Sequence, residues 1–565
     1  MDRPRRIAGA GDRLGGIGSG HASRTGWRGT LPAVVALAGA LLSGCASGPD
    51  YVRPSVATPA AFRQEPPAGW KEARAADRLP RGPWWQAYGD STLDALAGQA
   101  LAANQTVQAS EAAVRRSRAA LQQTGAARYP VLSGGFNASR TTGSSSAFSG
   151  GSGLGGGNTS SESWRAGLDA SWEVDLWGRV RRSVEAGEAD LQAADADLEN
   201  VRLSVLAELA RNYFDLRVLD AQRRLLADTV EAFERSLQLT RNRYESGVVP
   251  RVDVVQAEVQ LKGTQAQLVD TGIARAALES AVAVLVGRSP SAFQLDPVTA
   301  PVRRPRLDQP PPTDPAARHV QVAVADYPGL PELPVLPPGL PSDLLQRRPD
   351  IAAAERAVAA SSARIGVAAA AHYPSLSLSA SAGLRESSFS QLLRSPSWFW
   401  SPALSVLQVL FDAGAREAVT EQARAAHEGQ VANYRQVVLQ GFKEVEDNLA
   451  ALRILDEEIR LQEETLAAAR LALQLVNNQY QAGVINYLNV LTAQTSALNS
   501  ERSLLDLRGR RLAASVALVK ALGGGWQVPA EAASVNAAPA AAAPSEVAPN
   551  EAAPNEPAPG VPGTR

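Results

Sequence analysis

The residue types that most often carry chemistry are scarce in this chain of 565 residues and lie far apart. There is one cysteine, Cys45, whose thiol can be a nucleophile, a metal ligand or a site of modification. The histidines show no spacing typical of a metal site or of an acid–base pair. They are His21, His319, His372 and His427. The sequence therefore predicts a protein that is not an enzyme and that holds no metal or bound cofactor.

Cys45 directly follows the short apolar run 31–44, which itself follows an arginine-rich start. The run is too short and too rich in glycine to cross a membrane, so it predicts a signal peptide over residues 1–44. The tetrapeptide 42–45, Leu-Ser-Gly-Cys, resembles the bacterial lipobox, which implies a covalent lipid on Cys45. The alternative is an ordinary signal peptide with an incidental cysteine. Ala46 is not acidic, which in bacterial lipoproteins generally favours delivery to the outer membrane.

The overall charge and its distribution bear on whether nucleic acid is a partner. The net charge is -1, and lysine and arginine are scattered among aspartate and glutamate instead of being clustered. The electrostatic footprint of a nucleic-acid-binding protein is therefore missing, and we expect no nucleic acid among the partners.

An internal duplication organises the rest of the chain. Residues 242–261 read NRYESGVVPRVDVVQAEVQL, and 478–497 read NQYQAGVINYLNVLTAQTSA, which is 236 residues later. Nearer the start of each copy the offset is 244, so the first copy has a longer loop, placed at 141–163, where flexible segments tolerate insertion. A period this long indicates a duplicated domain and not a solenoid.

Each copy predicts the same succession of helices. A helix over about 91–128 or 342–371 ends before a proline, because proline disfavours helical geometry in the residue before it. A very long helix follows, over about 179–246 or 414–482, with apolar residues at helical spacing. A glycine ends it, and a last helix runs back over about 251–286 or 487–522. By themselves these helices would also fit a spectrin-like or coiled-coil scaffold.

Between the first and second helices of each copy, polar and apolar residues alternate as in strands. The alternation is clear at 164–174 and 376–384, weaker at 132–138, and least regular at 398–411, which contains Pro402. Strands of about ten residues that alternate in this way are typical of outer-membrane barrels. Four strands cannot close a barrel around water, and open edges cannot face lipid, so other chains must complete the sheet.

The motifs of the whole span from about Pro49 to Gly525 resemble those of one family. It is the TolC-type outer membrane factors, and within them the lipoprotein branch of the NodT and OprM kind. The motifs are LLSGC at 41–45, PDYVRP at 49–54, WWQAYGD at 84–90, RRPDI at 347–351, AHYPSLSLS at 371–379, VLFDAG at 409–414 and the two Tyr-x-x-Gly-Val turns.

The resemblance implies a mainly α-helical protein with a membrane β-barrel. Four strands from each chain of a homotrimer would make a 12-stranded barrel in outer membrane lipid, on a long periplasmic α-helical tunnel. The duplicated strand-hairpin and helix-hairpin unit would then give three chains approximate six-fold symmetry around one pore. The expected domains are the signal peptide 1–44, a lipid-anchored segment 45–89, repeat 1 at 90–287, a Pro-rich equatorial linker at 288–341, repeat 2 at 342–525 and a disordered Pro/Ala-rich tail at 526–565.

The resemblance also assigns roles to the two ends where the long helices turn back. In the family these tips touch a periplasmic adaptor, the membrane fusion protein, and the inner helix pair after the second tip closes the tunnel. The positions for adaptor contact are Gly247, Val248, Gly483 and Val484. The positions for the gate are Leu488, Thr492 and Thr495, with Asp253 and Gln256 offered at equivalent places of the first copy. The charged pair that is common in family gates is missing, so closure is expected from Leu488 and neutral hydrogen bonds. For these residues, simple structural packing is the alternative.

The resulting functional hypothesis is an outer membrane channel of a tripartite efflux system. It would passively conduct small toxic compounds from an RND-type inner-membrane pump and its adaptor to the exterior. One alternative is the conduit of a type I protein secretion system. Another, of a different class, is a lipid-anchored periplasmic adaptor or scaffold, which would have one helical hairpin and lipoyl-like half-motifs.

Overall fold

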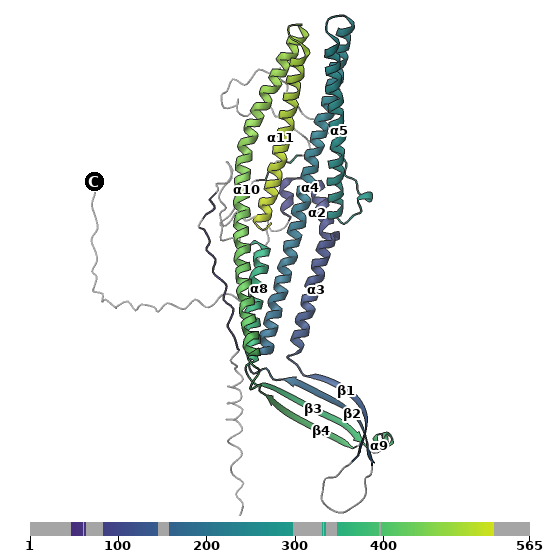
Figure 1. Cartoon of the computed structure of the whole chain (residues 1–565), viewed down its shortest axis with the longest axis vertical. Coiled ribbons are helices and arrows are strands. Elements are labelled where there is room, and N and C mark those ends of the chain that lie inside the picture. The colour runs from purple at the N-terminus through teal and green to yellow at the C-terminus, as the bar shows by residue number, and fades with distance from the viewer. Residues whose placement is uncertain are drawn as a thin grey trace, which may run out of the picture. The chain divides into compact units, whose positions relative to one another are not determined.

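The described residues of the computed structural model are 47–59, 61–63, 83–144, 158–297, 330–331, 333–334, 347–394 and 397–524. They fall into two compact units (Figure 1). The first, called here the sheet unit, contains the described residues up to Asp50 with 124–184 and 363–423. The second, called the helical unit, contains the remaining described residues. Cys45, the signal peptide, most of the Pro-rich linker and the C-terminal tail lie outside the described residues.

The sheet unit holds four antiparallel strands in the order β1-β2-β3-β4. They are β1 (Val131–Ser144), β2 (Asn158–Glu173), β3 (Ser375–Glu386) and β4 (Trp398–Leu407). All four predicted strands are present. The last one ends at Leu407 and not at 411, because Asp412 forms a turn in which its side chain accepts hydrogen bonds from the Gly414 and Arg416 amides. The short helix α9 (Phe389–Arg394), which the alternation pattern did not predict, joins β3 to β4.

The two copies meet in the middle of this sheet, where β2 pairs with β3. Gly167 and Gly383 are register partners there. A Cβ atom on Gly383 would lie 2.3 Å from the Ala166 carbonyl oxygen, closer than such contacts allow. Both glycines therefore permit a close backbone approach that a side chain would prevent. The outer strands β1 and β4 each pair with one strand, and among the described residues their other edges are unpaired.

The helical unit contains two long hairpins. The first is α4 (Arg179–Glu245) with α5 (Arg251–Leu285), and the second is α10 (Ala415–Gln481) with α11 (Tyr487–Ala521). The first residues of α4, up to Val184, and of α10, up to Ala423, belong to the sheet unit. These bounds agree with the predicted ones within a residue or two. The predicted stripes are largely buried, including Leu209, Tyr213 and Leu216 on α4 and Val445, Leu449 and Leu452 on α10. None of the described helices is both long and apolar enough to span a membrane.

The first predicted helix of each copy differs from the structure. The expected helix 91–128 is two helices, α2 (Ser91–Ala103) and α3 (Gln105–Ala126), with a break at Asn104. The Asn104 side chain accepts hydrogen bonds from the Thr106 and Val107 amides and donates one to the Leu285 carbonyl at 2.9 Å. It therefore caps α3 and contacts the end of α5. In the second copy α8 runs over Pro349–Ala370, and the expected start of this helix at 342 lies outside the described residues. Single turns of 3-10 helix, η1 (Trp84–Tyr88) and η2 (Pro290–Ala292), complete the unit.

Candidate functional site: the hairpin ends

The first hairpin end is the turn between α4 and α5. Gly247 has φ 74°, a left-handed conformation that residues with a Cβ adopt only with strain. Its amide donates to the Tyr244 carbonyl at 2.9 Å, and the Val248 amide donates to the Arg243 carbonyl at 2.9 Å. This is the Schellman arrangement, which satisfies the last carbonyls of a helix. It leaves the Val248 side chain 61% exposed.

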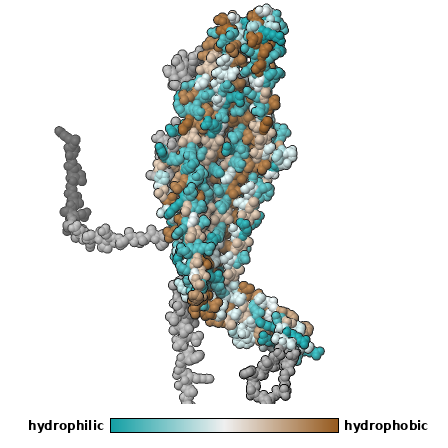
Figure 2. Space-filling view, viewed as in Figure 1, coloured by the Kyte–Doolittle hydropathy of each residue, from teal (hydrophilic) through white to brown (hydrophobic). Residues whose placement is uncertain are grey.

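The second hairpin end, between α10 and α11, has the same backbone turn. Gly483 has φ 77°, its amide donates to the Tyr480 carbonyl at 3.0 Å, and the Val484 amide donates to the Gln479 carbonyl at 3.0 Å. Val484 is 73% exposed. The four residues predicted from the Tyr-x-x-Gly-Val repeat therefore lie at two like turns, each presenting one valine to the surroundings. Hydrophobic surface is visible around both hairpin ends in Figure 2.

Within the helical unit the two hairpin ends pack against each other. The Tyr480 and Tyr487 rings meet edge to face with centroids 5.6 Å apart. Around them lies a buried apolar cluster to which all four long helices contribute. Its members are Phe233, Leu237, Ala257, Leu261, Tyr480, Tyr487 and Val490. Burial of this apolar surface stabilises the contact between the first hairpin and the second.

Arg243 adds a polar link between the two ends. Its Nη1 donates to the Tyr480 carbonyl at 2.9 Å, and its guanidinium lies 4.7 Å from the centroid of the Tyr480 ring. On the other side, the hydroxyls of Tyr487 and Ser236 are 3.4 Å apart. Burial raises the pKa of Tyr487, so this phenol stays protonated and able to donate. The second hairpin end is thus held against α4 at two points.

The predicted gate residues of α11 lie mostly on its exposed side. Leu488 is 51% exposed, and Thr492 is exposed as well. The Thr492 hydroxyl donates to the Leu488 carbonyl at 2.9 Å, and the Thr495 hydroxyl donates to the Leu491 carbonyl at 2.9 Å. Both donors are therefore used inside their own helix. Thr495 also accepts a long hydrogen bond of 3.5 Å from Gln260 of α5.

Asp253 and Gln256, the first-copy residues offered for the gate, differ in their match to the second copy and in their burial. At the offset of 236, Gln256 matches Thr492, but the match for Leu488 is Val252, which is 55% exposed. Asp253 is one position further along, is buried, and lines a groove together with residues of both hairpin ends. Burial raises the pKa of Asp253.

A groove of about 470 Å³ runs between the two hairpin ends. Gln256 lines it, and the Gln256 Oε1 atom is buried without a hydrogen-bond partner among the described residues. The groove brings together predicted residues of both copies with Arg243 and Tyr480, which the sequence reasoning did not single out. It is lined by Arg243, Val248, Val249, Pro250, Val252, Asp253, Gln256, Tyr480, Gly483, Ile485, Asn486 and Leu488.

Comparisons with known proteins agree with this architecture. Residues 96–288 and 340–524 match the outer membrane efflux protein family. The chain belongs to this family. The two matched segments correspond to the two copies of the duplication. The predicted family resemblance is confirmed.

Individual relatives match along nearly the whole chain. A cation efflux system protein, CusC of Escherichia coli O6:H1, is 29% identical over 88% of this chain and 98% of its own length. The pyoverdine export outer membrane protein OpmQ of Pseudomonas aeruginosa is 31% identical over 86% of this chain and 95% of its own. Among solved structures, the outer-membrane channel OprN covers 86% of this chain and all of its own, with a TM-score of 0.72 and 29% identity.

These findings confirm the fold class, the localisation and the general role. The chain is an outer membrane efflux channel, with four strands per protomer for a trimeric barrel and a long periplasmic helical part. Its homologues are outer membrane components of tripartite efflux pumps and work as homotrimers with an adaptor and an inner-membrane pump. The unpaired edges of β1 and β4 are where neighbouring protomers join such a barrel.

Arg243, Tyr480 and Tyr487 are the site residues that sequence reasoning missed. One signal for Tyr480 was available, since it is the tyrosine of the second Tyr-x-x-Gly-Val turn. Its counterpart Tyr244 is 44% exposed, so the repeat alone could not show that one tyrosine is buried and the other is not. Arg243 has glutamine at the equivalent position 479, and an unmatched residue carries no signal in a repeat comparison.

Proposed function

We propose that this channel conducts small toxic compounds, passively, from a pump of the resistance-nodulation-division type and its adaptor to the exterior. Two relatives support a small-molecule role, since one is named for cation efflux and the other for pyoverdine export. The observation that carries the proposal is the pair of hairpin ends, which expose one valine each beside a groove. Apolar side chains at the free end of a helical hairpin suit a protein partner, because exposed apolar surface of this kind marks interaction sites.

Drug accumulation in cells tests the transport role. We expect deletion of the gene to raise the accumulation of a fluorescent pump substrate such as ethidium, and the intact gene to restore efflux. Deletion of the pump gene should have the same effect, because the channel supplies no energy. If deletion instead abolished the release of a secreted protein and left dye accumulation unchanged, the chain would be a secretion conduit.

The adaptor would contact Gly247, Val248, Gly483 and Val484. The two valines are exposed, and the two glycines shape the turns that present them. A photo-crosslinking residue in place of Val248 or Val484 should capture the adaptor in cells. The same residue in place of Val284, which is 62% exposed at the other end of α5, should not. Equal capture from all three positions would contradict the assignment.

The gate would be formed by Leu488 of each protomer, with Thr492 and Thr495 as neutral neighbours. Leu488 is apolar and half exposed in the single chain, so three copies could pack together around the pore axis and exclude water. The threonine hydroxyls are already bonded within α11, which makes Leu488 the principal element of closure. Gln256 lines the same groove, while the burial of Asp253 favours a structural part for that carboxylate.

Cys45 would carry the lipid, and the described residues after it support a fixed position for the anchor. The Ser47 amide donates to the Trp177 carbonyl at 3.0 Å, and Gly48, at φ 92°, packs on the backbone of Gly366. Asp50 pairs with the buried Arg182 at 2.7 Å.

The segment that starts at Ser47 is thus bound to residues that follow β2 and precede β3. Cys45→Ser, secreted with a cleavable signal, should lack the lipid in a mass spectrum and stay in the membrane through its strands. A fully soluble monomer would argue against the shared barrel.

A further inference from the structure

Two helices of the helical unit, α5 and α10, each present large apolar side chains to the surroundings. On α5, Val269 and Ile273 are 77% and 74% exposed, and on α10, Ile454 and Leu461 are 56% and 50% exposed. In Figure 1, α10 and α5 are the outer two of the four long helices, and α11 and α4 are the inner two. Exposed apolar residues that gather on one side of an element indicate an interaction surface.

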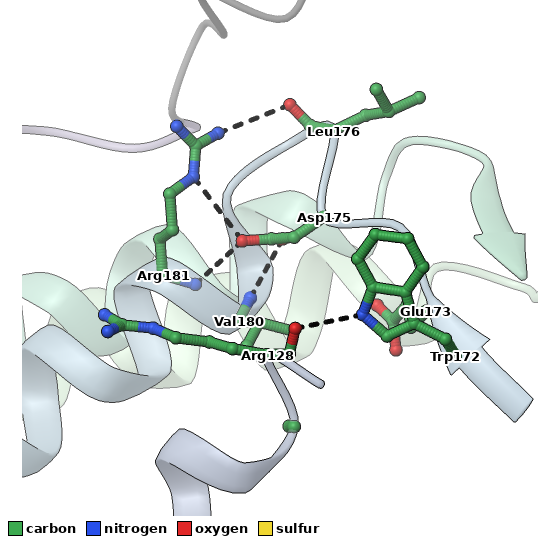
Figure 3. A pocket seen from close by; sticks show the side chains of 8 residues that line it. Arg128, Trp172, Glu173, Asp175, Leu176, Val180 and Arg181 are labelled. Atoms are coloured by element: carbon green, nitrogen blue, oxygen red, sulfur yellow. Dashed lines mark hydrogen bonds and ion pairs between the residues drawn. The ribbon is translucent and has the colours of Figure 1, made fainter. Parts of the chain in front are cut away.

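The charged pocket at the start of β1 and the end of β2 offers no comparable surface. Its Asp175 accepts hydrogen bonds from the Val180 and Arg181 amides at 3.0 and 2.8 Å (Figure 3). The Arg181 guanidinium lies 3.5 Å from the Asp175 carboxylate and 3.5 Å from the Leu176 carbonyl oxygen. These polar groups therefore satisfy one another within the chain.

The duplication shows what the exposed side chains of α5 and α10 would pack against, because their equivalents touch each other inside the chain. Val218 of α4 packs on Gly509 of α11, where a Cβ atom on the glycine would lie 3.0 Å from the Val218 Cγ2 atom. At the offset of 236, Val218 corresponds to Ile454 and Gly509 corresponds to Ile273. The members of the inner pair are both buried, and the members of the outer pair are both exposed.

A second contact between α4 and α11 has the same relation to α10 and α5. Leu225 and Leu505 belong to one buried cluster and are 2% and 0% exposed. Their equivalents are Leu461 and Val269, the other two exposed residues. The remaining buried members of the cluster, Ala221, Leu226 and Leu498, correspond to Glu457, Gln462 and Lys262, a set that includes one charge of each sign. Two packed positions between the inner helices thus have exposed counterparts on the outer helices.

We propose that α5 packs against α10 of a second copy of this chain, with Ile273 against Ile454 and Val269 against Leu461. Within the chain, the long helix of repeat 1 contacts the returning helix of repeat 2. Between two chains, the equivalent contact joins the long helix of repeat 2, which is α10, to the returning helix of repeat 1, which is α5. Burial of the four apolar side chains stabilises this contact.

The strands of the sheet require the same order of repeats. The unpaired edge of β4 belongs to repeat 2 and that of β1 belongs to repeat 1, so a second copy that joins the sheet also brings repeat 1 next to repeat 2. The two kinds of helix contact are alike and not identical, because two isoleucines replace a valine and a glycine. Since the distance between packed helices depends on the side chains at the contact, α5 and α10 lie farther apart at this level than α4 and α11 do.

Cysteine cross-linking in isolated membranes tests this contact. Two full-length chains with different affinity tags are produced together, one with Ile273→Cys and the other with Ile454→Cys, and a mild oxidant is added. The second pair is Val269→Cys with Leu461→Cys. The matched control is Ile273→Cys with Leu439→Cys, because Leu439 is also on α10 and is 55% exposed, but lies about 22 Å along the helix from Ile454. Each single variant is also oxidised alone.

We expect a covalent dimer that carries both tags from each of the two proposed pairs, and none from the control pair or from the single variants. A reducing agent should return the dimer to monomer on a denaturing gel. Failure of both pairs to cross-link, in protein that elutes as a trimer from a size-exclusion column, overturns the proposal. An equal yield from the control pair also overturns it. A disulfide to a protein other than this chain overturns the choice of partner, because a different protein then covers these faces.

Discussion

The two hairpin ends of this chain have the same backbone turn and different side chains around it. Gly247 and Gly483 have nearly the same φ and the same pair of hydrogen bonds. Tyr244 of the first end is 44% exposed, whereas its counterpart Tyr480 is 5% exposed under Arg243. After the turn, Val252 of the first end corresponds to Leu488 of the second.

The comparison shows that the two ends share the backbone turn and differ in the side chains around it. The turn itself depends on one glycine and on two backbone hydrogen bonds, and both copies have them. The side chains depend on what each end packs against, and only the second end has its tyrosines turned into the cluster shared with α4 and α5. The duplicated unit thus supplies two like turns whose surrounding side chains are packed differently.

The largest effect is expected from the shared turn. Gly247→Ala and Gly483→Ala each place a Cβ at a left-handed φ, which costs about 1–2 kcal/mol. No atom lies within 4 Å of the added Cβ at either position, so the cost comes from the backbone alone. Amide hydrogen exchange at the two ends should accelerate. The control Gly263→Ala, within α5 and equally uncrowded, should instead stabilise its helix by about 0.5–1 kcal/mol. Unchanged exchange in both turn variants would contradict the role of the glycines, and faster exchange in only one of them would contradict the equivalence of the turns.

How much of this could be read from the sequence depends on where each cause lies. The glycine turns and the long helices were predictable because their signals are local. A glycine marks a position with a left-handed φ, and apolar residues at helical spacing mark a helix. The break at Asn104 was not, since its side chain is held by the Leu285 carbonyl, a contact between residues 181 apart in sequence. The burial of Asp253 was also missed, because it depends on a groove to which residues of both copies contribute. Cys45 and the adaptor assignments remain predictions.

A smaller effect is expected from Arg243, the link that only one end possesses. Arg243→Ala removes the hydrogen bond to the Tyr480 carbonyl and the contact with its ring, each worth roughly 0.5–1.5 kcal/mol. The second hairpin end should loosen, and the closed-state conductance of the variant in planar bilayers should rise above that of the wild type. Gln479→Ala, at the equivalent position of the second end, should leave conductance unchanged. Equal leakage of the two variants would contradict the claim that Arg243 has a role that Gln479 lacks.

The smallest effect is expected from Asp253. Burial raises its pKa above 3.8, so the folded state binds the proton more tightly than the unfolded chain. The ionised carboxylate therefore destabilises the hairpin end at neutral pH, and the penalty fades as the pH falls through the raised pKa toward 3.8. Asp253→Asn should slow amide exchange of the α5 first turn at pH 7 and reduce its dependence on pH between 7 and 4. Faster exchange in the variant at pH 7 would show that the charge is stabilising.

Single-channel conductance of Leu488→Ser beside Val252→Ser tests most directly the claim that the second hairpin end closes the pore and the first does not. The two residues are equivalent in the duplication and are 51% and 55% exposed, so the substitutions differ chiefly in which end they alter. The account predicts a clear rise in resting conductance, with vancomycin sensitivity in cells, for Leu488→Ser, and wild-type closure for Val252→Ser and for Thr492→Ala. A tight Leu488→Ser channel, or a Val252→Ser channel that leaks as much, would contradict it.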